Sequence, residues 1–332
     1  MKRVLISGGA GLIGSNIVQA LCRHGGYQVI VADNLWRGKI EYLEPNGRPL
    51  INIKRDFFNL DLTSYRNCLT VTRDVDIVIH LADVVAGIDF VFSNQYFVFQ
   101  QNIEINTSIL KAAIKNNVEK FLYVGTACSY PADKQARITK TPLKEEDAYP
   151  ANPESGYGWS KLMGEYELGL AADEGLIEAS ILRLHNVYGP PSEVDPYRSQ
   201  VIPALCRKAV EFPKSEFLVW GSGRQRRAFV FVSDVVDAIL RSLDYGFGKG
   251  VIQIGPSESI SIAEVAQKIK KISGKPINIK FDLSKNEGDV DRKADSSKAK
   301  RILGWEPQVS FDEGLEKTYQ WVANEVGRYS NG

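Results

Sequence analysis

One stretch of the chain decides the fold: residues 4–14 read VLISGGAGLIG, an apolar run that ends directly in closely spaced glycines. The spacing of Gly8, Gly11 and Gly14 is a variant of the pattern that joins a strand to a helix around the pyrophosphate of a dinucleotide. Gly8 allows the tight turn, Gly11 lets the backbone approach the pyrophosphate, and Gly14 lets the helix pack close to the strand. We therefore expect a dinucleotide at this loop. Its contacts are expected at Gly8, Gly11, Leu12, Ile13 and Gly14.

An acidic residue stands where the second strand is expected to end. Residues 28–32 form the next apolar run, and Asp33 and Asn34 follow it. A carboxylate at this place accepts both ribose hydroxyls and repels a 2′-phosphate, which favours NAD over NADP. Arg37 lies nearby in the sequence and leaves NADP as the alternative. We expect NAD, with Asp33 and Asn34 among the residues that bind it.

Short apolar runs alternate with helical patterns over the first 185 residues, an order typical of a parallel sheet with helices on both faces. The expected strands are residues 4–7, 28–32, 51–55, 76–80, 121–125 and 179–184. Helical spacing of apolar residues covers 12–24 and 101–117. Nucleotides bind such sheets at the carboxyl ends of the strands. Asp56 and Phe57, directly after the third expected strand, are therefore predicted near the adenine, and a plain loop aspartate is the alternative for Asp56.

The alternation breaks after about residue 185, where several prolines precede a helical stretch near 202–211 and a Gly-Ser-Gly turn at 221–223. Residues 1–185 are therefore expected to form a Rossmann-type domain with a doubly wound parallel sheet. Residues 186–332 are expected to form mainly a smaller mixed α/β lobe that binds the substrate, and some of its segments can return to the first sheet.

The charge balance excludes several classes of function. The chain has 332 residues with 41 Lys and Arg against 40 Asp and Glu, so its formal net charge is +1. This gives no field for nucleic acid or an anionic membrane, and no apolar run approaches the ~20 residues of a membrane span. Four scattered cysteines and three histidines without ligand spacing predict neither a disulfide framework nor a metal site. The N-terminus has no apolar signal core, so we expect a cytoplasmic protein.

A tyrosine and a lysine stand four residues apart in the sequence YGWSK at 157–161. On a helix this spacing places Tyr157 and Lys161 on one face. An ammonium beside a phenol is expected to lower the phenol's pKa from ~10. Tyr157 would then exchange a proton with a hydroxyl or carbonyl group near neutral pH. The alternative is an ordinary pair on a surface helix.

These motifs together resemble the extended short-chain dehydrogenase/reductase family that modifies nucleotide-sugars. The resemblance covers nearly the whole chain. It is carried by the glycine loop, Asp33, the HLA sequence at 80–82, Asn102, Thr126, the Tyr157/Lys161 pair and the NVYGP sequence at 186–190. It implies a Rossmann lobe that holds NAD and a C-terminal lobe that holds a nucleotide-diphosphate sugar.

The resemblance also implies roles for individual residues. Thr126 would bind the sugar 4-hydroxyl, and Tyr157 would take its proton as hydride passes to the nicotinamide. Lys161 would bind the nicotinamide ribose. The remaining expected contacts are Leu81, Ala82 and Asn102 for the cofactor, and Asn186, Arg227 and Arg292 for the sugar diphosphate. For the arginines, a solvated surface position is the alternative.

Within this family, the sequences TACSYP at 126–131 and LKEEDA at 143–148 resemble GDP-mannose 3,5-epimerases and, next, GDP-fucose synthases. In both groups a cysteine two residues after the Ser/Thr acts as a base on a sugar carbon, and Cys128 stands there. A small buried residue without chemistry is the alternative. The acid partner falls by residue count on Asp195, while Glu193 and Arg198 of the same loop are also candidates.

The sequence therefore predicts an NAD-dependent epimerase of a nucleotide-diphosphate sugar that acts through a 4-keto intermediate, with C3 or C5 chemistry at Cys128. A UDP-sugar 4-epimerase, a reductase like GDP-fucose synthase and a non-catalytic NAD-binding regulator are the alternatives. Because the family dimerises through two helices per subunit, we expect a homodimer formed by residues 94–117 and 156–174.

Overall fold

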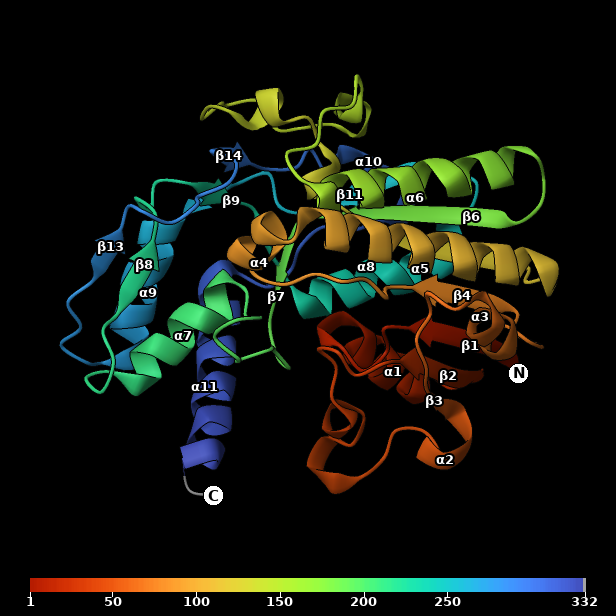
Figure 1. Ribbon diagram of the computed structural model, residues 1–332, viewed down its shortest axis with the longest axis horizontal. Coiled ribbons are helices and arrows are strands. Elements are labelled where there is room, and N and C mark those ends of the chain that lie inside the picture. Colours follow the sequence, from red (N-terminus) through yellow and green to blue (C-terminus); the bar gives the residue numbers. More distant parts are fainter. Residues whose placement is uncertain (331–332) are drawn as a thin grey trace.

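A seven-stranded parallel sheet forms the centre of the computed structural model, which describes residues 1–330 (Figure 1). The strand order is β11-β6-β5-β4-β1-β2-β3, and every neighbouring pair is parallel. The strands are β1 (Lys2–Ser7), β2 (Tyr27–Asp33), β3 (Phe57–Asn59), β4 (Ile77–His80), β5 (Lys120–Thr126), β6 (Glu178–Leu184) and β11 (Val251–Ile254). The order reverses between β1 and β4, which is where a ligand crevice opens in such sheets.

Helices cover both faces of this sheet. On one face lie α1 (Leu12–His24), α8 (Val232–Tyr245) and α10 (Ser297–Leu303), and on the other lie α3 (Tyr65–Val71), α5 (Gln95–Lys115) and α6 (Gly156–Asp173). Successive strand residues point to opposite faces, so Val4 and Ile6 of β1 join the first core and Leu5 joins the second. The predicted doubly wound α/β fold is confirmed.

The third strand lies later in the chain than the sequence predicted. Residues 53–56 form a single helical turn, α2 (Ile53–Asp56), and β3 begins only at Phe57. The cause is Asn52, whose side-chain oxygen accepts hydrogen bonds from the backbone N–H groups of Lys54 (3.1 Å) and Arg55 (3.2 Å). Because such a cap favours a helical turn over an extended strand, the prediction of a strand at 51–55 is wrong.

The rest of the second half packs around a separate core beside the sheet (Figure 1). Its short strands pair as β7 with β10, β8 with β13, and β9 with β12 and β14. The strands are β7 (Asn186–Tyr188), β8 (Leu218–Trp220), β9 (Arg226–Arg227), β10 (Phe229–Phe231), β12 (Ile260–Ser261), β13 (Lys280–Asp282) and β14 (Asp291–Arg292). The helices are α7 (Val201–Glu211), α9 (Ile262–Ser273) and α11 (Phe311–Ser330). Strand β11 nevertheless pairs within the large sheet, and helix α8 packs against that sheet, so the chain returns to the first domain.

Short helical segments complete the fold. Among them α4 (Ile88–Ser93) precedes α5 and lies against the cavity described below. The 3-10 turns are η1 (Ile40–Leu43), η2 (Pro45–Gly47), η3 (Ala127–Ser129), η4 (Ala132–Gln135) and η5 (Glu145–Ala148). Within residues 1–330, every helix is too short or too polar to cross a membrane.

Candidate active site

A cavity of about 660 Å³ lies between the carboxyl ends of the central strands and the smaller core. Five buried side-chain N or O atoms within the described chain have no hydrogen-bond partner, and four of them belong to residues that line this cavity. These residues are Arg37, His185, Asn186 and Gln225. Buried polar atoms are nearly always paired in folded proteins, so their concentration here indicates a site for a polar ligand.

The glycine loop forms one end of the cavity. Gly8 has a φ of +73° and makes the tight turn after β1, while a Cβ at Gly14 would stand 2.3 Å from the Gly8 carbonyl oxygen. Helix α1 begins after Gly11, which provides no side-chain cap for its first N–H groups. An uncapped helix N-terminus facing a cavity binds anions such as a pyrophosphate. Of the predicted contacts, Gly8, Gly11, Leu12, Ile13 and Gly14 all line the cavity.

Asp33 ends β2 on the same wall, beside Asn34. Its carboxylate accepts hydrogen bonds from the backbone N–H groups of Ala10 (3.0 Å) and Leu35 (2.8 Å), which fix its orientation. Burial raises the pKa of Asp33, and these two bonds oppose the shift. Arg37 also lines the cavity and donates through Nη1 to the Val85 carbonyl (2.7 Å). Asp33 therefore lines the cavity at the end of β2, and its contact with the ribose stays a prediction.

Asp56 and Phe57 lie away from this cavity, which corrects the predicted adenine contacts. Asp56 precedes β3 rather than following it. Its Oδ2 accepts a hydrogen bond from Nη2 of its neighbour Arg55 (2.8 Å). Both residues line a separate depression at the other end of β2. The residues just beyond the carboxyl end of β3, at 60–62, line the cavity instead. The error follows directly from the misplaced third strand.

Asn102 of α5 is also absent from the cavity wall. It is fully buried, and its amide binds both backbone groups of Val84: Oδ1 accepts from the N–H (2.6 Å) and Nδ2 donates to the carbonyl (3.2 Å). The side chain of Asn102 therefore binds backbone rather than facing the cavity. Asn102 fixes the segment after β4, in which Leu81, Ala82 and Asp83 line the cavity.

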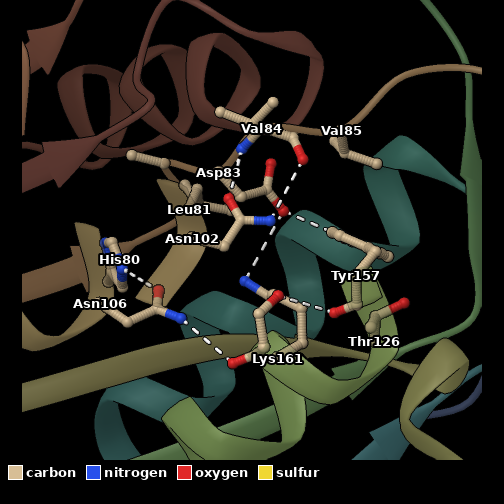
Figure 2. Close-up of polar contacts among 12 residues, drawn as sticks. His80, Leu81, Asp83, Val84, Val85, Asn102, Asn106, Thr126, Tyr157 and Lys161 are labelled. Atoms are coloured by element: carbon tan, nitrogen blue, oxygen red, sulfur yellow. Dashed lines mark hydrogen bonds and ion pairs between the residues drawn. The ribbon is translucent and has the colours of Figure 1, made fainter. Parts of the chain in front are cut away.

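Tyr157 and Lys161 stand on one face of α6, as their spacing predicted, and both reach Asp83 (Figure 2). The Tyr157 hydroxyl donates to Asp83 Oδ2 at 3.0 Å, and Lys161 Nζ lies 3.6 Å from the same oxygen. The Lys161 ammonium also stands 4.6 Å from the centroid of the Tyr123 ring. Tyr157 lines the cavity, whereas Lys161 is buried behind it.

The pKa of Tyr157 departs from the sequence-based prediction. Burial, followed by the negative charge of Asp83, raises it well above the ordinary value for a phenol. Lys161 does not reverse this effect, because its ammonium is engaged by the same carboxylate. Burial also lowers the pKa of Lys161, and Asp83 opposes that shift. The expectation that the lysine lowers the phenol's pKa is therefore wrong, and Tyr157 is protonated at neutral pH.

Thr126 and Cys128 lie beside Tyr157 on the cavity wall, where β5 ends in the turn η3. The Thr126 Oγ1 accepts from the backbone N–H of Cys128 (3.3 Å). The Cys128 sulfur accepts a hydrogen bond from Arg292 Nη1 at 3.1 Å. The thiol is thus placed against a guanidinium and open to the cavity, which is an arrangement that suits chemistry at sulfur.

Arg292 is held among buried partners. Its Nε donates to Gln135 and its Nη2 to Asp289, so each guanidinium nitrogen has an acceptor. Burial acts to lower the pKa of Arg292, but Cys128 and Asp289 outweigh it and raise the pKa. Its predicted role as a diphosphate ligand stays a prediction, and the structure adds the contact with Cys128.

A carboxyl group that was not singled out from the sequence, Glu154, completes this cluster. It lines the cavity, and its electrostatic neighbours are Asp289, Arg292 and Arg227. Burial and then the nearby Asp289 carboxylate raise the pKa of Glu154 to about 7. Glu154 is therefore partly protonated at neutral pH and can act either as an acid or as a base.

Asp195 does not line the cavity, which corrects the predicted acid partner of Cys128. Its Oδ1 caps the loop by accepting from the backbone N–H of Tyr197 (2.9 Å). Glu193 of the same loop is buried, lines the cavity and lies 3.8 Å from Arg198 Nη2. The residue count selected Asp195, but the path of this loop, which the sequence does not determine, brings Glu193 rather than Asp195 to the cavity.

Asn186 and Arg227 also line the cavity, and their role in binding the sugar diphosphate stays a prediction. The Oδ1 of Asn186 is buried without a partner. Arg227 is also buried and donates to the backbone carbonyls of Arg226 (2.8 Å), Asp289 (2.6 Å) and Glu287 (3.2 Å). Among residues 1–330, His, Cys, Asp and Glu side chains form no group of three or more suited to a metal ion.

Sequence reasoning missed Asp83 and Glu154. The first had a usable signal, because it follows the HLA sequence at the carboxyl end of β4, beside the switch point of the sheet. Glu154 had none, because it lies in a loop before α6 and meets residues more than 70 positions further along the chain.

Comparisons with known proteins agree with this geometry. A model of the NAD dependent epimerase/dehydratase family matches residues 4–255. The GDP-mannose 3,5-epimerase of Arabidopsis thaliana is 34% identical over 324 residues, which cover 98% of this chain and 83% of that protein. The solved UDP-glucose 4-epimerase of Thermotoga maritima with UDP-glucose has a TM-score of 0.85 and 28% identity, over 98% and 99% of the two chains. The UDP-glucuronic acid 4-epimerase of Bacillus cereus, solved with UDP-glucuronic acid and NAD, has a TM-score of 0.82 and 26% identity, over 97% and 99%.

Proposed function

Because the chain belongs to the NAD dependent epimerase/dehydratase family, as its motifs predicted, we propose that it epimerises a nucleotide-diphosphate sugar through a transient 4-keto intermediate, with a base step at Cys128. NAD is the cofactor, and the uncapped start of α1 and the carboxylate of Asp33 fit its pyrophosphate and ribose. One observation carries the proposal: the phenol of Tyr157, the thiol of Cys128 and the glycine loop line a single cavity.

The first step is proton removal from the sugar 4-hydroxyl. When bound, NAD accepts the C4 hydride and later returns it. Thr126 holds the hydroxyl, and the Tyr157 oxygen takes its proton, since both side chains line the cavity near the carboxyl end of β5. The phenol of Tyr157 carries a proton at neutral pH, and this proton passes to the C4 oxygen when the ketone is reduced again.

The second step acts on the neighbouring carbons. A ketone at C4 acidifies the hydrogens on C3 and C5, so a base can remove one and an acid can return a proton from the other face. We assign the base to Cys128, which Arg292 orients at 3.1 Å. We assign the acid to Glu154, which shares Arg227 and Arg292 as neighbours with Cys128 and is partly protonated near pH 7.

The nucleotide portion is assigned mainly to residues 186–332. Asn186 and Arg227 lie on that side of the cavity, and the unpaired Asn186 oxygen and Gln225 oxygen are free to accept from a ligand. The relative with GDP-mannose in its name makes GDP-mannose the first compound to test. UDP-glucose is the second, because the structurally similar epimerase was solved with it.

Incubation of the NAD-loaded protein with GDP-mannose in deuterated water tests the proposal. We expect deuterium to enter at C3 or C5, as detected by NMR or mass spectrometry. The Cys128→Ser variant should not incorporate this label. Cys22→Ser is the matched control, because Cys22 lies in a different depression and its loss leaves the label intact. Product formation without carbon-bound deuterium would contradict the Cys128 step.

A simple 4-epimerase is the second candidate, favoured by the full-length likeness to two 4-epimerase structures. It needs Thr126, Tyr157 and hydride return to the opposite face. Inversion at C4 of UDP-glucose without deuterium uptake would select this reaction. A net reductase would instead consume a reduced cofactor in proportion to product, and Asp33, which repels a 2′-phosphate, argues against NADPH in that role.

We also propose a homodimer. Trp159, Met163, Tyr166 and Leu170 are between 38% and 61% exposed, and their spacing places them along one stripe of α6. Tyr96 on the neighbouring helix α5 is 78% exposed. An apolar stripe of this length on a monomer marks an interface. Sedimentation of the parent protein is expected to show a dimer. The double variant Tyr166→Glu/Leu170→Glu is expected to sediment as a monomer. A monomeric parent protein would exclude this interface.

A further inference from the structure

Asp83 occupies a position that the proposed reaction does not yet use. It lies directly behind the Tyr157 hydroxyl, on the segment that Asn102 fixes after β4 (Figure 2). A phenol has one proton to donate and accepts through its oxygen lone pairs. Because the Tyr157 proton goes to Asp83 Oδ2 at 3.0 Å, the oxygen is left to accept a hydrogen bond from a group in the cavity.

We propose that Asp83 is the proton acceptor behind Tyr157, so that a sugar hydroxyl transfers its proton to the Tyr157 oxygen while the Tyr157 proton moves to Asp83. The inference rests on the proposed function and deepens it. In this step the sugar O–H bond and the original tyrosine O–H bond break, and a new tyrosine O–H bond and an Asp83 O–H bond form. Bound NAD would supply the acceptor for the C4 hydrogen and its electron pair. When hydride returns, both protons move back.

The relay solves a chemical problem set by the site. A tyrosine whose pKa is raised by burial and by a carboxylate is protonated at neutral pH, and a protonated phenol cannot accept a proton unless it passes its own on. Asp83 is in direct contact and provides that acceptor. The same hydrogen bond keeps Tyr157 oriented in both directions of the reaction.

Charged and titratable groups from several elements surround Asp83. Lys161 Nζ stands 3.6 Å from the oxygen that would be protonated, and the Arg37 guanidinium acts on Asp83 electrostatically from beyond β2. Tyr157 and, from β5, Tyr123 are the titratable phenols coupled to it. In the proposed relay, the proton that Asp83 takes up returns to Tyr157 when the ketone is reduced.

A titration without substrate tests the coupling of the two groups. Tyrosinate absorbance near 295 nm is followed against pH for the parent protein and for Asp83→Asn. The same titration is recorded for each protein with the additional change Tyr157→Phe, and the difference isolates the signal of Tyr157 from those of the other tyrosines among the 14 of the chain. We expect Tyr157 to ionise at lower pH in Asp83→Asn, because the carboxylate is gone while Lys161 remains. An unchanged Tyr157 titration would overturn the inference.

Kinetics test the relay itself. With GDP-mannose as the probe, Asp83→Asn is expected to lose at least ~100-fold in kcat near pH 7, the scale of one acid–base group, and to regain activity at alkaline pH as Tyr157 ionises. Asp83→Glu keeps a carboxylate and is expected to keep the parent pH profile at a reduced rate. Solvent isotope inventories should show two protons in flight for the parent protein and one for Asp83→Asn.

Asp89→Asn is the matched control, because Asp89 lies on α4, outside the cavity lining, 3.8 Å from Lys285. It should leave both the rate and the pH profile unchanged. A parent pH profile retained in Asp83→Asn would overturn the relay. If the parent protein does not turn over GDP-mannose or UDP-glucose, the proposed function fails, and the absorbance titration still decides whether Asp83 controls the Tyr157 proton.

Discussion

Two walls of one cavity each contain a buried cation close to a carboxylate, but the groups that carry protons differ between the two walls. In the tyrosine wall (Asp83 and Tyr157, with Lys161 buried behind them), one carboxylate stands between a phenol and an ammonium, and the phenol keeps its proton. In the cysteine wall (Cys128, Glu154, Arg227 and Arg292, with Asp289 buried behind them), two guanidinium groups lie near a thiol and two carboxyl groups, and one of these carboxyl groups, Glu154, has a pKa of about 7. The first arrangement suits proton transfer at oxygen, and the second suits proton transfer at carbon.

The largest effect expected from this difference is a separation of the two chemical steps. Tyr157→Phe removes the oxygen that exchanges the 4-hydroxyl proton, so we expect kcat to fall by about 10³-fold or more, together with loss of transient NADH absorbance at 340 nm. Glu154→Gln should keep the transient NADH signal and lose deuterium exchange at carbon by about 10²-fold. Equal loss of both signals in Glu154→Gln would place it on the oxidation step and break the comparison.

The second effect concerns stability. Arg292 and Asp289 are both nearly buried and in direct contact, so Arg292→Met leaves a buried carboxylate without its cation. We expect the free energy of unfolding in urea at pH 7.5 to fall by about 3–5 kcal/mol. Lys161→Met should lower the free energy of unfolding by less than half of this amount, because the side chain of its partner Asp83 is 15% exposed.

Arg241→Met provides the scale for these measurements. Arg241 pairs with Asp237 at 2.7 Å on the outer face of α8, and both side chains are nearly half exposed. Removing such a pair should cost less than about 1 kcal/mol. If Arg292→Met proves no more costly than Arg241→Met, the cysteine wall is not the electrostatic unit described above.

The glycine loop, Asp33 and the Tyr157/Lys161 pair could be predicted from the sequence, whereas the contacts within the cysteine wall could not, and the reason is the range of the contacts. The glycine loop, Asp33 and the Tyr157/Lys161 spacing are local patterns, and local backbone geometry places each of them. Arg292 meets Cys128 across 164 positions of the chain, which no local pattern records.

The two errors in residue position have a similar cause. A strand was placed from its apolar letters at 51–55, but the cap at Asn52 turns that segment into a helix and moves β3 to Phe57. Counting along the loop after β7 selected Asp195, whereas the loop directs Glu193 into the cavity. Side-chain hydrogen bonds and loop paths decide which residue faces a site, and neither follows from hydrophobic periodicity.

The smallest predicted effect is a pH dependence of stability that belongs to the cysteine wall alone. Burial and Asp289 raise the folded-state pKa of Glu154 to about 7, above the value of 4.5 for an ordinary glutamate. Between these two pH values the folded protein binds a proton that the unfolded chain does not, so the contribution of Glu154 to stability declines as pH rises through this window.

Because Glu154 is partly open to the cavity, solvent screening reduces this contribution to about 1–2 kcal/mol. The difference in unfolding free energy between pH 5 and pH 8 should therefore shrink by that amount in Glu154→Gln. Glu174→Gln, at an exposed carboxyl group just after α6, should retain the full difference. An unchanged difference in Glu154→Gln would mean that Glu154 is ionised throughout, and the acid partner of Cys128 would then have to be Glu193.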